Sequence, residues 1–297
     1  MIMKSQVKEN VKKHYSKIPQ QEGNGCCESC GDQTLNVNEY GKNIGYSKED
    51  LNSVPSGANL GLGCGNPLAL EEIKPGDTVV DLGSGAGFDC FLAAQKVGPN
   101  GLVIGVDMTP EMIAKANENK GKVRATNIDF RLGNIEELPV ESDSVDMIIS
   151  NCVINLSLEK PRVFREAFRV LKPGGVLAVS DIVLYRKLPW FIRKSVNAYV
   201  GCISGASTKD KYLEHIKAAG FEAIDIIQEH SVDKIFPEND PTIQKLMRFI
   251  PLPRKTIRTL SGRYAGSIQI RASKPLTVTT NKLKHLKDKV ELVSATA

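Results

Sequence analysis

The stretch Asp81-Leu82-Gly83-Ser84-Gly85-Ala86-Gly87 decides the fold of this chain. It continues the apolar run that begins at Thr78, and such a run is typical of a buried parallel strand. Residues 88–97 then have the small and apolar pattern of a helix. Glycines let a backbone turn sharply, and a helix start offers unpaired N–H groups. A strand, a glycine turn and a helix in this order therefore predict a loop that holds a nucleotide-type cofactor.

The spacing of the glycines narrows the kind of cofactor. Gly83, Gly85 and Gly87 follow a Gly-x-Gly-x-Gly pattern, whereas dinucleotide enzymes have Gly-x-Gly-x-x-Gly. With Asp81 two residues ahead, the pattern resembles that of class I S-adenosylmethionine-dependent methyltransferases. The resemblance implies S-adenosyl-L-methionine as cofactor. It also implies an α/β fold with a Rossmann-like, mostly parallel sheet of seven strands.

The next strands supply further cofactor contacts. Residues 102–107 end in Asp107, whose carboxylate can accept both ribose hydroxyls of an adenosyl group. A strand over residues 128–132 leads into the turn at residues 133–136, which brackets the adenine ring in the methyltransferase pattern. A fourth strand, residues 145–150, should end with Cys152 pointing into the site, because ligands bind outside the carboxyl ends of such strands. The cofactor contacts that we expect are Tyr40, Asp81, Gly83, Ser84, Gly85, Gly87, Asp107, Met108, Asn134, Ile135, Glu136 and Asn151.

Turns rich in Pro and Gly predict that the chain divides into four parts. Residues 1–77 form a helix over residues 7–15 and a turn-rich, cysteine-rich lid. Residues 78–230 form the cofactor-binding methyltransferase domain, with an insertion around Cys202. This domain has helices at residues 161–171 and 211–219, the latter capped by Thr208, and strands at 176–183 and 221–228. Residues 231–275 add a last antiparallel strand over 265–273, and residues 276–297 form a basic tail.

Composition and charge exclude several classes of protein. The chain has 297 residues, of which 41% are hydrophobic and 25% charged, as in a soluble enzyme. It has no apolar run of membrane-spanning length and no signal-peptide core, so we expect a cytoplasmic protein without a membrane partner. The net charge of +5 comes from residues 241–297, which hold twelve Lys or Arg against Asp288 and Glu291. Few aromatic residues interleave with them, so we expect a solvated face and no nucleic-acid site.

Seven cysteines in a reducing compartment are more often reactive or metal-linked than paired. Cys64 and Cys202 lie in glycine-rich loops, and Cys152 follows a strand that ends beside the cofactor. Three such thiols suggest a soft methyl acceptor such as trivalent arsenic. Cys90 reads as a core residue of the first helix after the loop. The cluster Cys26, Cys27 and Cys30 lacks the fourth ligand of a structural zinc site, so we expect a group of reactive thiols.

Three motifs resemble those of the arsenite methyltransferase family. They are Gly61-Leu62-Gly63-Cys64-Gly65-Asn66-Pro67, Ser150-Asn151-Cys152-Val153-Ile154-Asn155-Leu156 and Gly201-Cys202-Ile203-Ser204-Gly205-Ala206. The similarity is strongest over residues 40–183 and is weak after residue 231. It implies that thiolates of Cys64, Cys152 and Cys202 are the catalytic and arsenic-binding groups. It also implies arsenite methylation for arsenic detoxification, with a thiol reductant such as thioredoxin or glutathione as partner.

Two other functions are compatible with these patterns. One is a methyltransferase for another small molecule, such as a quinone or a sterol. Such a site would usually need a general base, and none of the four histidines falls in a motif. The other is an arsenic sensor that has the fold without catalysis, against which the intact cofactor loop argues.

Overall fold

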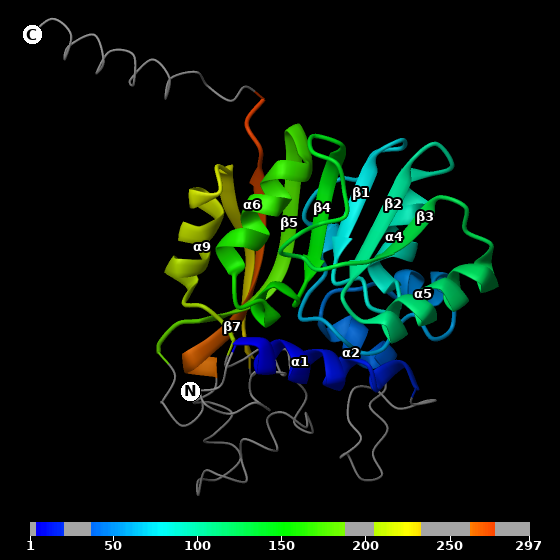
Figure 1. Ribbon diagram of the computed structural model, residues 1–297, viewed down its shortest axis with the longest axis horizontal. Coiled ribbons are helices and arrows are strands. Elements are labelled where there is room, and N and C mark those ends of the chain that lie inside the picture. The colour runs from blue at the N-terminus through cyan, green and yellow to red at the C-terminus, as the bar shows by residue number, and fades with distance from the viewer. Residues whose placement is uncertain (1–3, 21–36, 188–204, 233–261, 277–297) are drawn as a thin grey trace, which may run out of the picture.

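The computed structural model describes residues 4–20, 37–187, 205–232 and 262–276. In these ranges the chain forms one seven-stranded sheet with the order β3-β2-β1-β4-β5-β7-β6 (Figure 1). Strands β1 to β5 pair in parallel, and β7 is antiparallel to both β5 and β6. The strands are β1 Thr78–Leu82, β2 Leu102–Asp107, β3 Ile128–Leu132, β4 Val145–Asn151, β5 Leu171–Leu184, β6 Glu222–Ser231 and β7 Ala265–Ser273. The α/β methyltransferase fold expected from the sequence is confirmed.

Helices cover both faces of the sheet. Alternate residues of each buried strand point to opposite sides, so both faces carry apolar side chains that the helices bury. Val80 and Ile148 pack with α6 and α9 on the face toward the viewer in Figure 1, and Val79 and Met147 pack with α4 on the other. The helices are α1 Lys4–Tyr15, α2 Val37–Asn43, α3 Lys48–Ser53, α4 Phe88–Val97, α5 Pro110–Val123, α6 Lys160–Val170 and α9 Lys209–Ala218. Short 3₁₀ turns are η1 Ile18–Gln20, η2 Pro67–Ala69 and η3 Ile154–Leu156.

Two local expectations differ from the structure. Strand β5 begins at Leu171, five residues before the predicted start, because Leu171 already pairs with Val145. The register of β4 and β5 shifts directly after this pair. Thr208 precedes α9 as predicted, but its side chain does not cap the helix. Thr109 precedes α5 in the same way, and its side chain hydrogen-bonds the Asp107 carboxylate.

Residues 37–77 of the predicted lid segment pack against the sheet. Tyr40, Ile44 and Leu51 are buried with residues of β1 and α4 in one apolar cluster. Figure 1 shows α1 and α2 along the edge at which β1 ends, so the amino-terminal segment lies beside the candidate site. The division into four parts stays a prediction. Within the described ranges, no helix combines the length and apolar character that crossing a bilayer requires.

Candidate active site

The loop after β1 has the backbone that its glycines were expected to provide. Gly83, Gly85 and Gly87 have φ angles of +73°, +51° and +94°, in the left-handed region that residues with a Cβ rarely adopt. An added Cβ would collide with Val153 at Gly83 and would lie 2.7 Å from Phe130 at Gly87. Gly83 and Gly87 therefore have no room for a side chain, and at Gly85 the left-handed backbone alone favours glycine.

Asp107, at the end of β2, ties this loop to the neighbouring strand. Its Oδ2 accepts a hydrogen bond from the Gly85 amide at 3.0 Å, and its Oδ1 accepts one from the Thr109 amide at 2.9 Å. Burial raises the pKa of this carboxyl, while the bonds from the backbone oppose the rise. The Thr109 side chain also donates to this carboxylate, whose two oxygens have about four acceptor positions in total, so capacity remains for a donor such as a ribose hydroxyl.

A second group of carboxyls lies behind the loop. Tyr46 Oη donates to Asp89 Oδ1 at 2.6 Å, and Cys90 Sγ donates to Asp81 Oδ2 at 3.3 Å. Burial raises the pKa of Asp89 to about 6, and burial together with the nearby Asp89 raises that of Asp81 well above its usual range. Neither carboxyl has an ion-pair partner among the described residues. The predicted core position of Cys90 is confirmed, since its side chain is fully buried.

These groups suit S-adenosylmethionine, which carries a sulfonium and an ammonium group. A cationic ligand stabilises ionised carboxylates that burial would otherwise disfavour. The hydroxyl of Ser84, in the middle of the glycine loop, is buried and has no hydrogen-bond partner among the described residues. A buried polar atom of this kind calls for a ligand or a water molecule. The buried carboxyls, the Ser84 hydroxyl and the glycine backbone therefore fit the cofactor that the sequence implies.

Asn151, the last residue of β4, fastens the Cys64 loop to the sheet. Its Oδ1 accepts a hydrogen bond from the Cys64 amide at 2.9 Å. Its Nδ2 donates to the Gly65 carbonyl at 2.7 Å and to Tyr46 Oη at 3.0 Å. Gly65 leaves no room for a Cβ, which would collide with Ser180 on β5. The Asn151 side chain thus links Tyr46, which is the hydrogen-bond partner of Asp89, to the loop that carries Cys64.

We expect Asn151→Ala to loosen Cys64 from its position. The Cys64 amide and the Gly65 carbonyl would lose partners in a part-buried setting, which costs about 1–3 kcal/mol of unfolding free energy. A reagent that must bridge two thiols, such as phenylarsine oxide, should then bind more weakly. Fluorescence titration and urea unfolding measure the two effects. Asn117→Ala is the matched control, because the exposed Asn117 side chain only bonds the Ile113 carbonyl of its own helix. Unchanged affinity for the bridging reagent would show that Asn151 does not position Cys64.

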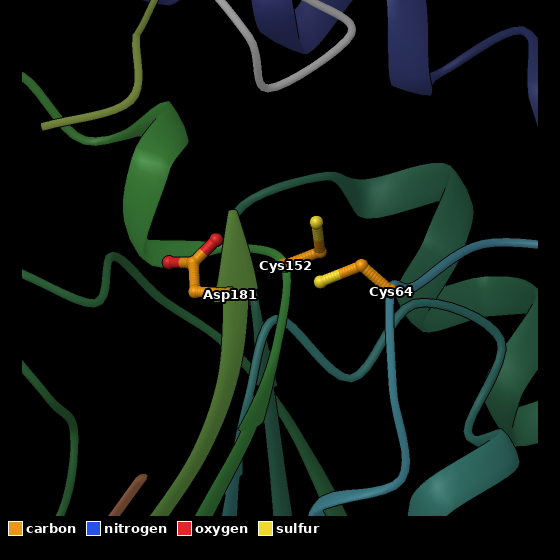
Figure 2. A group of neighbouring side chains, drawn as sticks. All are labelled: Cys64, Cys152 and Asp181. Carbon is orange, nitrogen blue, oxygen red and sulfur yellow. The ribbon is translucent and has the colours of Figure 1, made fainter. Parts of the chain in front are cut away.

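Cys64 and Cys152 meet at the carboxyl edge of the sheet, as Figure 2 shows. Their Sγ atoms and a carboxylate oxygen of Asp181 all lie within 4.8 Å of one another. Cys64 is buried and its carbonyl accepts a hydrogen bond from Ser267 Oγ at 2.8 Å. Cys152 is partly exposed, has a φ of +62°, and its amide donates to the Ser180 carbonyl at 2.8 Å. The prediction that Cys152 points into the strand-end site agrees with this geometry.

Asp181, on β5, is the member of this cluster that the sequence reasoning missed. It is fully buried, and its Oδ1 accepts from Asn155 Nδ2 at 2.7 Å and from the Ile182 amide at 2.9 Å. Tyr212 Oη donates to Oδ2 at 3.0 Å. Burial raises the pKa of Asp181 to about 7. An acid near the carboxyl end of an apolar strand was the signal available, the same one that identified Asp107.

Several predicted cofactor contacts have protein partners in this structure. Tyr40 Oη donates to the Gly63 carbonyl at 2.7 Å and so supports the Cys64 loop. Glu136 accepts from Ser157 Oγ at 2.7 Å and from Lys8 Nζ of α1 at 3.5 Å. Ile135 is buried in the core, Asn134 is exposed, and Met108 directly follows Asp107 at the end of β2. The cofactor roles of these residues stay predictions.

Four of the cysteines singled out in the sequence lie outside the described residues. They are Cys202, Cys26, Cys27 and Cys30. Among the described residues, Cys64, Cys90 and Cys152 are free thiols. The predicted approach of Cys202 to the other two thiols therefore stays a prediction.

Comparison with known proteins shows similar sequences. Residues 73–220 match the family model of a methyltransferase domain. An arsenite methyltransferase of Halobacterium salinarum is 49% identical over 74% of this chain and 59% of its own length. Over about three quarters of its length the chain is thus similar to an arsenite methyltransferase. Its fold is that of the class I methyltransferases.

Two further proteins are similar to the chain at lower sequence identity. An arsenite methyltransferase of Aquipseudomonas alcaligenes is 40% identical over 57% of this chain and 51% of its own length. The solved structure of an arsenic(III) S-adenosylmethionine methyltransferase from Chlamydomonas reinhardtii has a TM-score of 0.58 and 28% identity. The match covers 82% of this chain and 74% of that one. The chain thus spans between half and three fifths of the length of the two curated relatives.

Proposed function

We propose that this protein transfers methyl groups from S-adenosylmethionine to trivalent arsenic bound by cysteine thiolates. The observation that carries the proposal is the pair of thiols, Cys64 and Cys152, gathered at the strand edge that also bears the glycine loop. Trivalent arsenic is soft and prefers thiolates to oxygen ligands, by the softness argument used for metal ions. The detoxification of arsenic would be the biological use of such an activity.

The residues that would hold the cofactor are the glycine loop, Ser84 and Asp107, with Asp81 and Asp89 as countercharges. The bound cofactor supplies a methyl group on a positively charged sulfur. Asp107 already fixes the Gly85 amide, and its remaining lone pairs suit the ribose hydroxyls. Asn151 would act on the other side, by keeping Cys64 beside Cys152 through the Cys64 amide.

The two thiols would hold arsenic in a pyramidal arrangement, with Cys202 as a further ligand. The arsenic lone pair is the nucleophile, so the chain needs no general base to activate it. No histidine belongs to the cluster of Cys64, Cys152 and Asp181 in the described part of the chain. The task of these residues is mainly alignment, and orientation of reacting groups can supply roughly 7–11 kcal/mol of rate enhancement.

The partners of the reaction follow from its thiol chemistry. We infer that a thiol reductant, such as thioredoxin or glutathione, keeps the cysteines reduced between turnovers. A reducing cytoplasm would suit the free thiols of Cys64 and Cys152, so we place the protein there.

Incubation with arsenite, a thiol reductant and cofactor carrying a labelled methyl group tests the proposal. A demethylated quinone offered in a parallel reaction tests the alternative acceptor. Label recovered in methylated arsenic supports the proposal, and label recovered only in the quinone contradicts it. Binding of arsenite without binding of S-adenosylmethionine would identify a sensor.

We expect Asp107→Ala to weaken cofactor binding by about 1–3 kcal/mol, because the ribose hydroxyls lose their acceptors and the Gly85 amide loses its partner. Isothermal titration with S-adenosylmethionine measures the change. Asp129→Ala is the matched control, since Asp129 is a half-exposed acid of the adjacent strand that pairs with Arg131. Equal affinity of Asp107→Ala and wild type would refute the assignment of Asp107.

We also expect the amino-terminal thiols to deliver arsenic without holding it during transfer. Replacing Cys26, Cys27 and Cys30 by Ser should slow the reaction severalfold at low arsenite. Transfer to thiol-bound methylarsenite should keep the wild-type rate, since delivery is then bypassed. Initial rates over a range of arsenite concentrations give the answer. Total loss of activity with both substrates would instead make the cluster part of the reaction centre.

A further inference from the structure

We propose that Cys64, Cys152 and Asp181 form a binding site for a thiophilic divalent cation, such as Zn²⁺ or Cd²⁺, that competes with arsenic for the two thiols. The inference concerns the same cluster as the proposed function but does not depend on methyl transfer. It starts from Asp181, a buried oxygen ligand that a soft arsenic atom does not need.

The three ligand atoms have nearly the spacing that such a cation requires. All lie within 4.8 Å of one another. In a tetrahedral zinc site, with Zn–S bonds near 2.3 Å, two sulfur atoms lie about 3.8 Å apart. A movement of about 1 Å would therefore close the site, and Cys152 is partly exposed at the end of β4. Three protein ligands would leave a fourth position open to water or another thiol.

The charge of the cluster fits a dication better than a neutral arsenic species. Two thiolates and one carboxylate carry three negative charges, and a dication leaves one. The buried ammonium of Lys160 lies close enough to Asp181 to help stabilise its ionised form. Lys160 Nζ also donates to the Asn155 carbonyl at 3.2 Å, and Asn155 Nδ2 donates to Asp181. Lys160 is therefore a counterion for the remaining negative charge, and Asn155 connects it to Asp181.

Hydrogen bonds orient the carboxylate of Asp181, as they do in carboxylates that bind metal ions. Donors to its two oxygens come from Asn155, Tyr212 and the Ile182 amide. Such outer hydrogen bonds orient a ligand and typically contribute 10–100-fold to metal affinity. Binding would release the thiol protons to solvent, because each cysteine coordinates as a thiolate.

The test uses the full chain with Cys26, Cys27 and Cys30 replaced by Ser, so that the amino-terminal thiols cannot bind the probe. Cd²⁺ is titrated in the presence of a non-thiol reductant, and the thiolate-to-cadmium absorbance and the heat are recorded. We expect one ion per chain, displaced by arsenite. Cys64→Ser and Cys152→Ser should each lose this binding, and Asp181→Asn should weaken it by about 10–100-fold or more.

Two further variants keep the test decisive. Asp225→Asn, at an exposed position on β6, is the matched control and should bind Cd²⁺ as the parent does. Tyr212→Phe removes one donor to Asp181 and should weaken binding about tenfold or more, which serves if Asp181→Asn does not fold. Absence of Cd²⁺ binding, or equal affinity of the parent and these Asp181 and Tyr212 variants, would overturn the inference. Cd²⁺ binding by a chain that does not methylate arsenite would refute the proposed function alone.

Discussion

Cys152→Ser is expected to lower methyl transfer to both arsenite and methylarsenite by about a hundredfold or more, because misplacement of a reacting atom by about 1 Å already costs that much. Cys152 is the thiol that a central strand of the sheet carries directly. It directly follows β4, its amide donates to the Ser180 carbonyl, and its backbone is left-handed. A serine hydroxyl is a hard ligand and would not retain arsenic. Cys202→Ser, outside the described residues, is expected to have the same effect.

The control for Cys152→Ser is cofactor affinity. The variant should bind S-adenosylmethionine as wild type does, since the Asp107 carboxylate is held by the Gly85 and Thr109 amides, which the substitution leaves in place. Methyl transfer is followed by chromatography of the arsenic products. A folded Cys152→Ser variant that methylates arsenite at near the wild-type rate would contradict the arsenic assignment of this site.

Cys64→Ser is expected to separate the two arsenic substrates. Arsenite has three exchangeable positions and can bind three thiolates, whereas methylarsenite has two. The loss of one thiolate should therefore reduce methylation of arsenite by about a hundredfold and leave that of methylarsenite within about tenfold of wild type. Initial rates with each substrate, at saturating cofactor, give the comparison.

The position of Cys64 in the structure supports this prediction. Cys64 is buried, lies beside Cys152, and is held through Asn151 and Ser267. Equal loss with both substrates would mean that Cys64 and Cys152 are the pair used at every transfer, with Cys202 as the third ligand. Tyr40→Phe is a milder control, because it removes only the hydrogen bond to the Gly63 carbonyl of the same loop.

Local patterns were enough to predict the parts of the site that lie on consecutive strands. The apolar run before Gly83, the glycine spacing and the acid at Asp107 each reflect one strand and its turn. The rule that ligands bind at the carboxyl ends of parallel strands then brought Cys152 to the same edge. The last strand, β7, was predicted as antiparallel, and its place between β5 and β6 came only from the sheet.

The contacts between distant segments could not be predicted in this way. Asn151 meets the Cys64 amide across 87 residues of sequence, and Tyr46 meets Asp89 across 43. Nothing in the pattern around Cys64 fixes which strand end it approaches, since Cys64 lies in a loop between the short helices α3 and η2. The apolar strand before Asp181 was a local signal for this acid, but its place beside the two thiols comes from the tertiary structure. These features depend on tertiary packing, which no local pattern encodes.

Arsenic X-ray absorption of the arsenite-loaded protein tests the central claim most directly, namely that the thiols at this strand edge hold arsenic beside the cofactor loop. The protein should lack Cys26, Cys27 and Cys30, so that only the strand-edge site reports. We predict arsenic bound to sulfur alone in this parent, and one sulfur replaced by oxygen in its Cys64→Ser variant. Arsenic bound mainly to oxygen in the parent, or the same spectrum in both proteins, would contradict the account.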